Sequence, residues 1–484
     1  MGRRRLRAYI GYAAGLSVAA AVLVGGGTLA GCSLAWADTI EWALVQAYQN
    51  NPSLNAQRAV LRATDENVPQ ALSGYRPKIS AVATGGYNYT NTQTRLISPG
   101  LNPPSTNGNV FTNLAGDFGA RSIGVTASQT LYNGNQTANK TRQAESQVMA
   151  ARETLRVTEQ QVLLDAAGAY MDLLRDEAVL ALQRSNVEVL TEQLKQTRDR
   201  FNVGEVTRTD VAQAESRLAA GRSQLLAAQS QYVTSQAQYR RIIGVDPGHL
   251  APGTPVDRLS PSTLAAAISQ GQALSPSVLA AMYGVDVAEL AVKVSEGALY
   301  PTLGVQASVA KDWDATLITP KLTQTSVLGT LTVPLYQGGA EYSGIRQSKE
   351  TLGQQRLTLD INRDQARETV VQYWGALDAA KAQIEATTAQ VNASEIALNG
   401  VREEARVGQR TTLDVLNAQQ ELVNARVALV QAQHDRVVAS YQLLAAVGAL
   451  SMQRLGLDVT IYDPMIHYQQ IRDAWVGVRN PDGR

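Results

Sequence analysis

The chain has few of the residues that catalysis and metal binding need. It contains one cysteine, three phenylalanines and three histidines in 484 residues. A single cysteine excludes a framework of disulfides within the chain. His249, His434 and His467 lie far apart in the sequence, outside any metal-binding spacing, and are expected to be structural or solvent-facing. Neither G-x-S-x-G nor H-E-x-x-H occurs. We therefore predict no enzyme and no cofactor.

Long apolar runs are also missing, except near the N-terminus. Residues 1–37 have the layout of an export signal, with four arginines, an uncharged apolar stretch and a small-x-small site ending at Ala37. Cleavage between Ala37 and Asp38 is favoured because a helical pattern starts at once. The competing site is Leu-Ala-Gly-Cys, which resembles a bacterial lipobox and would leave an acylated Cys32.

Neither sign of charge dominates. The formal net charge is +1, and loss of the four signal arginines, with no acidic residue among them, changes it to −3. A nearly neutral chain lacks the basic surface that nucleic acid requires as a partner. We therefore expect no nucleic acid.

The chain does contain an internal repeat. VGEVTRTDVAQAE (residues 203–215) returns as VGQRTTLDVLNAQ (residues 407–419), with six of thirteen positions identical at an offset of 204. Farther upstream NPSL (residues 51–54) matches SPSV (residues 275–278) at an offset of 224. The first copy thus carries an insert, and its polar, turn-forming residues 98–109 are expected to form an exposed loop.

Each copy changes its hydrophobic period in the same order. Strict alternation, as in Ile123, Val125 and Ala127, predicts strands over 78–91, 117–132, 302–314 and 325–336. Such lengths suffice to cross a membrane at a tilt, although a soluble sheet with one wet face has the same pattern. A seven-residue period predicts supercoiled helices. The helices are expected over 39–74, 136–202, 208–243, 263–299, 340–406 and 412–447.

These elements define two repeats, 38–243 and 262–448, with a linker (244–261) and a C-terminal segment (449–484) at mid-height. We expect the helices over 208–243 and 263–299 to stack end to end beside the long helix. Four strands cannot close a barrel, and lipid does not tolerate an open sheet edge. Several copies must therefore share a barrel, and a pore requires at least three of them.

Several of these segments resemble the TolC family of outer-membrane exit ducts. They are TIEWALVQAYQNNPSL, ATDENVPQALSGYRP, RFNVGEVTRTDVAQAE and ARVGQRTTLDVLNAQQ. The resemblance implies a membrane β-barrel plus a long α-helical coiled-coil barrel: a homotrimer with twelve strands in the outer membrane of a Gram-negative bacterium and a twelve-helix periplasmic tunnel. It also implies a periplasmic adaptor (membrane fusion protein) and an inner-membrane ABC transporter or proton-driven pump as partners. In this family the tunnel tip is closed at rest.

The tail YDPMIHYQQIRDAW (residues 462–475) is similar to the branch that serves type I protein secretion. We therefore favour that cargo class, with multidrug or small-molecule efflux through the same fold as the alternative. A hypothesis from another class is a periplasmic coiled-coil scaffold without a pore, which would have no use for strands of membrane-crossing length.

The repeated motif has a place in this frame. Val203, Gly204, Val407 and Gly408 would form the two turns at the periplasmic tip, where an adaptor docks. Thr-x-x-Asp after each turn also fits a helix capping box, which is the alternative explanation for both aspartates.

The resemblance adds a gate. Asp414 matches an acidic ring at the constriction, and Arg410 matches a latch to Thr209 and Asp210. Two residues depart from the family pattern. Asn417 stands where a second acid is expected, so the constriction should bind cations less tightly. Ala405 replaces an aromatic residue, so one latch contact is missing.

Overall fold

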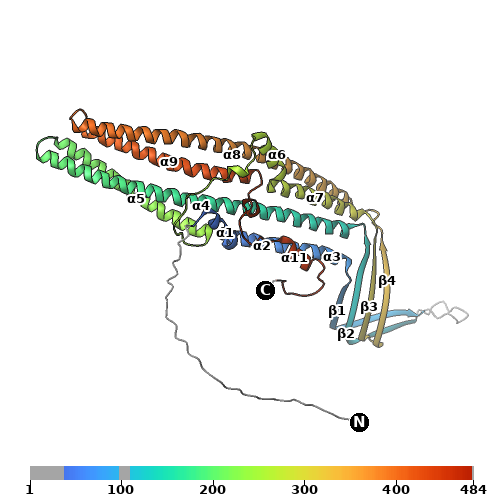
Figure 1. The fold of residues 1–484 in the computed structure, drawn as a ribbon. Coiled ribbons are helices and arrows are strands. Elements are labelled where there is room, and N and C mark those ends of the chain that lie inside the picture. The colour runs from blue at the N-terminus through green and yellow to red at the C-terminus, as the bar shows by residue number, and fades with distance from the viewer. Residues whose placement is uncertain (1–37, 97–109, 482–484) are drawn as a thin grey trace, which may run out of the picture.

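The computed structural model describes residues 38–96 and 110–481. The predictions for Cys32 and Ala37, and that of a loop over 98–109, lie outside these residues. The chain is elongated, with a sheet at one end and two hairpin turns at the other (Figure 1). The helices are α1 (Ile40–Asn50), α2 (Pro52–Asp65), α3 (Asn67–Leu72), α4 (Gln136–Asn202), α5 (Arg208–Ile243), α6 (Leu264–Leu274), α7 (Pro276–Glu296), α8 (Ala340–Arg406), α9 (Thr412–Ala446), α10 (Met452–Leu455) and α11 (Pro464–Ile471).

The sheet is antiparallel, in the order β1 (Lys78–Leu96), β2 (Val110–Asn133), β3 (Thr302–Thr316) and β4 (Thr319–Thr332). Its register places side chains of one kind in rows. One row is apolar and the next is polar. The apolar row is Ile79, Ala127, Ala307 and Val327, and the polar row is Ser80, Thr126, Ser308 and Ser326. Ile79 and Val327 are 72% and 75% exposed, so the apolar face is bare in the single chain.

The strand bounds differ from those predicted. β1 and β2 continue beyond 91 and before 117, because the inserted segment pairs with itself from Asn91 opposite Ala115 to Leu96 opposite Val110. The strand predicted over 325–336 begins six residues earlier, directly after a two-residue turn, and ends at Thr332. Pro334 follows, and a proline cannot donate to the ladder.

Two predicted helices are broken, and at corresponding positions. The helix expected over 39–74 breaks between α1 and α2 at Asn51 and again before α3, and that over 263–299 breaks at Ser275. A proline follows each of the two matched positions, where it starts the next helix because it has no N–H to donate. The amide oxygen of Asn51 caps α2 by accepting from Ser53 N at 2.9 Å.

The prediction that α5 stacks end to end with the helix over 263–299 is wrong. Asn51 Nδ2 donates to the carbonyl of Ile242 at 3.1 Å, so α5 ends against the α1–α2 junction of its own copy. In the second copy Gly448, after α9, lies against the Leu274 carbonyl at the α6–α7 junction. Each return helix therefore abuts the broken helix that begins its own repeat, and both copies share this one contact.

The core lies at mid-height, where the linker and the C-terminal segment meet the helices. Tyr170, Tyr441 and Leu444 are fully buried there. Val256 and Leu259 of the linker pack against this cluster. Asp38 joins the same layer, because its carbonyl accepts from Ala251 N at 3.0 Å and from the Tyr170 hydroxyl at 2.7 Å. Among the helices of residues 38–96 and 110–481, none is long and apolar enough to cross a membrane.

Candidate functional site

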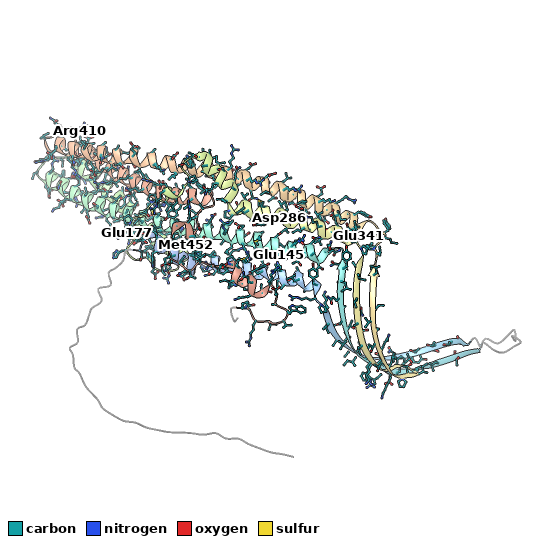
Figure 2. All side chains as sticks on the ribbon, turned by 45° about the vertical axis from the view of Figure 1, so that its right-hand side comes forward. Glu145, Glu177, Asp286, Glu341, Arg410 and Met452 are labelled. Atoms are coloured by element: carbon teal, nitrogen blue, oxygen red, sulfur yellow. The ribbon has the colours of Figure 1, made fainter. Side chains whose placement is uncertain are left out.

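The two turns lie together at the end of the molecule opposite the sheet, where Figure 2 labels Arg410. Gly204 and Gly408 have φ of +83° and +78°. An added Cβ would meet no atom at either glycine, so the left-handed backbone, not space, calls for glycine. Val203 and Val407 before them are 73% and 72% exposed. The predicted docking valines thus lie bare at the tip of the chain.

Both aspartates of the repeated motif sit in capping boxes. Asp210 Oδ2 accepts from the N–H and the hydroxyl of Thr207 at 2.9 and 2.8 Å. Asp414 Oδ2 accepts from the same groups of Thr411, both at 2.9 Å. The Thr411 N–H and hydroxyl, with the charge of Arg410 a smaller cause, lower the pKa of Asp414. Capping therefore accounts for the position of each carboxylate within one chain.

The contact of Arg410 within its own chain was not predicted. Its Nε donates to Glu404 Oε2 at 2.8 Å, across the second turn. The first turn has the charges reversed, with Arg200 Nε donating to Glu205 Oε2 at 3.0 Å. Among the described residues of one chain, Arg410 does not contact Thr209 or Asp210. The latch between the second turn and the helix of the first repeat thus remains a prediction.

Asn417 joins the two hairpins. Its Oδ1 accepts from Arg217 Nη2 of α5 at 2.7 Å. An acid here would make an ion pair with Arg217, so the departure from the family pattern keeps the contact with less charge. Ala405 packs with an apolar cluster that includes Leu398 and Val415, where no polar partner is needed.

Two of the three histidines pair with an aspartate from a distant part of the chain, and no sequence pattern predicts these pairs. His434 of α9 lies 3.0 Å from Asp172 of α4. His467 of α11 lies 3.0 Å from Asp65 of α2, whose side chain is 0% exposed. Both partners are more than 250 positions away in the sequence, so only the fold brings these groups together.

The chain is duplicated, and two long helical hairpins join a sheet that has an uncovered apolar face and unpaired edges. These features define a class of protein, the outer-membrane channel-tunnels. The chain belongs to the outer membrane efflux protein family, which matches residues 43–245 and 267–449. The two matched ranges correspond to the two copies of the repeat. The protein is accordingly a non-enzymatic duct component of the outer membrane that extends into the periplasm.

Curated relatives cover most of the chain. The outer membrane efflux protein BepC of Brucella suis is 42% identical over 96% of this chain and 97% of its own. The outer membrane protein TolC of Vibrio cholerae is 27% identical, covering 88% and 94%. The alkaline protease secretion protein AprF of Pseudomonas aeruginosa is 26% identical, covering 65% and 67%.

Solved structures share the fold at low identity. The Campylobacter jejuni CmeC outer membrane channel superposes with a TM-score of 0.72 at 16% identity, covering 90% of this chain and 89% of its own. CusC gives 0.71 at 15%, covering 85% and 92%. The combined barrel and coiled-coil fold predicted from the sequence is thereby confirmed. Membership of the outer membrane efflux protein family contradicts the pore-free scaffold.

Proposed function

We propose that three copies of this chain form the exit duct of a tripartite export system, which passively conducts cargo from an inner-membrane pump to the exterior. The observation that carries the proposal is the open sheet. β1 and β4 each have one unpaired edge, and unpaired backbone groups cost several kcal/mol each in lipid. Pairing β4 of one copy with β1 of the next satisfies every edge and closes a cylinder.

The helices support the same assembly. α8 lies on the outside of the chain and exposes Leu357, Ile361 and Ile396 at 65%, 66% and 74%. Apolar side chains on a helix face that the chain itself does not cover are expected at an interface. A neighbouring protomer whose sheet pairs with β4 brings its own helices to this face of α8.

For cargo we favour proteins, delivered by an ABC transporter through a periplasmic adaptor. Two relatives support this preference, because their names are alkaline protease secretion protein and proteases secretion protein. The second candidate is small-molecule efflux with a proton-driven pump, favoured by the efflux name of the 42% identical relative. Deletion of the gene separates them: a lost set of secreted proteins supports the first, and raised drug sensitivity with an unchanged secretome supports the second.

Conductance tests the duct itself. The purified protein should run as a trimer in detergent and conduct ions in planar lipid bilayers. Ile396→Glu, which places a charge on the exposed face of α8, should weaken the trimer at least about tenfold because a buried unpaired charge is costly. Glu395→Gln, one residue away, is the matched control. A monomer that stays soluble without detergent and conducts nothing would refute the proposal.

We also propose that the tip is the gate. In this proposal Arg410 exchanges Glu404 for Thr209 and Asp210 at the start of the first repeat's return helix, and Asp414 contributes one carboxylate per protomer to the constriction, with Asn417 beside it. The open, charged surroundings of Arg410 in the single chain support such an exchange, since both Arg410 and Glu404 are about half exposed. The four turn residues Val203, Gly204, Val407 and Gly408 are the proposed contacts of the adaptor.

A further inference from the structure

The two helical hairpins, α4–α5 and α8–α9, share few polar contacts. Two side-chain hydrogen bonds join them within the described chain: Arg217 to Asn417, near the turns, and His434 to Asp172, closer to mid-height. The first is exposed to solvent, whereas the imidazole of His434 is only 11% exposed. Movement of one hairpin against the other must therefore break or strain the contact of His434.

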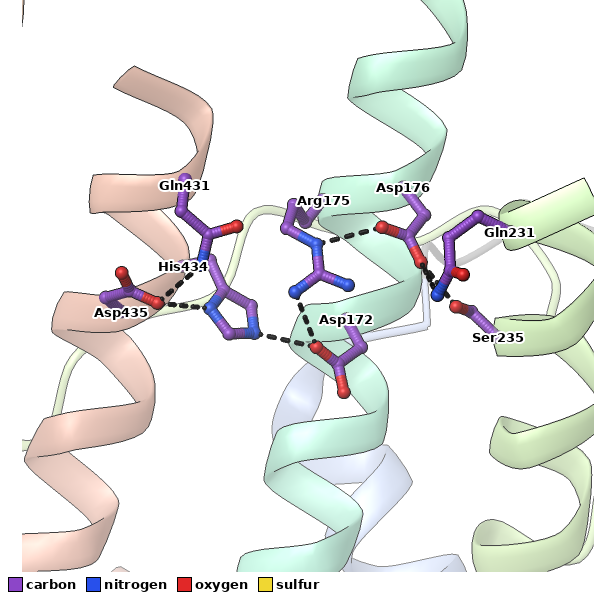
Figure 3. Close-up of polar contacts among 8 residues, drawn as sticks. All are labelled: Asp172, Arg175, Asp176, Gln231, Ser235, Gln431, His434 and Asp435. Carbon is purple, nitrogen blue, oxygen red and sulfur yellow. Dashed lines mark hydrogen bonds and ion pairs between the residues drawn. The ribbon is translucent and has the colours of Figure 1, made fainter. Parts of the chain in front are cut away.

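The imidazole lies between two carboxylates (Figure 3). Its Nε2 is 3.0 Å from Asp172 Oδ1 on α4, and its Nδ1 is 2.9 Å from Asp435 Oδ1 on α9. A neutral imidazole has one N–H and one lone pair, so it would direct a lone pair at one carboxylate. The imidazolium donates to both. The geometry alone thus matches the protonated ring.

Arg175 extends this contact into a network across three helices. Its Nη1 lies 2.9 Å from Asp172, and its Nε donates to Asp176 at 2.8 Å. Asp176 is 5% exposed and accepts from Ser235 of α5. Asp172 is therefore held by Arg175, whose other partner, Asp176, is bound by α5. His434 is left as the member whose charge can change near neutral pH.

We infer that His434 is a proton-operated fastener between the hairpins: when protonated it holds α9 against α4, and when it loses its proton the hairpins separate and the duct opens more often. The inference rests on the proposed function, because the duct is what opens. The site responds to the pH of the periplasm, because the ligand that it binds and releases is a proton.

The charges around His434 set the direction. Asp435 faces it from α9, Asp172 and Arg175 face it from α4, and α5 contributes only neutral groups, which bind Asp176. Towards α8 and the linker, the carboxylate of Asp257 is paired with two cations, Arg436 and Lys381, and so adds no net negative charge. Burial opposes protonation, but the hydrogen bonds to Asp172 and Asp435 outweigh it and raise the pKa of His434 above 6.5.

Asp172 sets the acidic limit of the pH range in which the contact is stable. Burial acts to raise its pKa, yet His434 and Arg175 bring it below the ordinary 3.8. A raised histidine pKa stabilises the fastened state below 6.5, and this contribution is lost as pH rises through the folded value. A lowered aspartate pKa stabilises it above 3.8, and this is lost as pH falls through the folded value. The fastener is therefore strongest in mildly acidic conditions and weakens on the alkaline side.

Single-channel recording of the reconstituted trimer between about pH 5.5 and pH 9 tests the inference. Open probability should rise about tenfold with pH, which corresponds to about 1.4 kcal/mol. His434→Gln should be open at every pH, and His434→Lys, with a permanent charge, should stay closed at every pH. His249→Gln alters an exposed histidine and should behave like the unchanged protein.

A structural measurement keeps the test independent of the current. Spin labels at Val203→Cys and Val407→Cys report the distance between the two turns, which should increase with pH in the parent and stay constant in both His434 variants. Identical pH dependence in the parent and in His434→Gln, by current and by distance, would overturn the fastener. Label distances that depend on pH and on His434, in a protein that never conducts, would refute the duct and support the fastener.

Discussion

The same unit occurs twice in this chain, yet its two copies are packed very differently. The long helices α4 and α8 both have 67 residues, but α4 buries 19 side chains and α8 only 8. α4 runs between α2, α5, α7 and α9, whereas α8 packs on α6, α7 and α9 at the side of the chain. The repeated sequence determines the local structure of both long helices. Their positions in the protomer determine which helix face a neighbouring protomer must cover.

The largest expected effect is in the interior of the first copy. Leu163→Ala in α4, at a fully buried position, should lower the free energy of unfolding by about 2–5 kcal/mol because it removes apolar contacts and leaves a cavity. Leu357→Ala in α8, at a 65% exposed position of the single chain, should cost less than about 0.5 kcal/mol in protein that has been dissociated to the monomer. Urea unfolding followed by circular dichroism measures both. Equal losses would contradict the contrast between the copies.

The next effect concerns a carboxylate that is buried in the first copy of the repeat and exposed in the second. Asp65 is fully buried against His467, whereas its counterpart Glu289 pairs with Lys293 on the surface. His467→Ala should cost about 3 kcal/mol because it leaves a buried charge without a partner. Lys293→Ala should cost less than about 1 kcal/mol, as usual for exposed pairs.

The loss in His467→Ala should also depend on pH. Burial is the main cause that raises the pKa of Asp65, so its carboxylate takes up a proton at higher pH than a free one. A protonated carboxyl needs no cation. The destabilisation should therefore be greatest at neutral pH and shrink as pH falls towards that pKa. Thermal unfolding at several pH values measures it, and a loss that grows in acid would show that Asp65 is not the group responsible.

A smaller effect is expected at the proposed gate. Arg410→Ser removes the cation of the proposed latch, and resting conductance should rise about two- to fivefold, the range expected for one exposed charge pair. Arg200→Ser removes the corresponding pair of the first turn and serves as the matched control. Planar-bilayer recording compares the two. Equal resting conductance in the two variants would show that the proposed gate does not depend on the second turn more than on the first.

The smallest effect is on ion block. Asp414→Ala should weaken block by multivalent cations by a factor of about two, because Asn417 already lowers the charge of the proposed constriction and salt screens what is left. Glu205→Ala removes an exposed carboxylate of the first turn that is not part of the proposed gate, and it should leave the block unchanged. Equal block in the parent and in Asp414→Ala would place the constriction elsewhere.

Much of the fold could be predicted because the patterns are long and occur twice. The ends of α4, α5 and α8 follow directly from heptads bounded by glycine turns. The breaks before Pro52 and Pro276 were missed, because the hydrophobic period continues through them while the backbone hydrogen bonding does not. The stacking of α5 was assigned to the wrong partner, since helix lengths alone fit either arrangement.

The site was predictable only where it is local. Thr411 and Asp414 lie three residues apart, so their capping box could be read from spacing. Glu404 as a partner of Arg410 was missed because the resemblance suggested another partner. The pair of His434 with Asp172 spans 262 positions. Such a contact depends on the packing of two hairpins, and no periodicity in the sequence encodes it.

The unequal strands have a consequence for the cell surface. β1 and β2 have 19 and 24 residues, against 15 and 14 for β3 and β4, while about 9–11 residues cross a bilayer. In a ring of three protomers, long hairpins from the first copy alternate with short ones from the second. The exterior mouth therefore has threefold and not sixfold symmetry, although six hairpins form it.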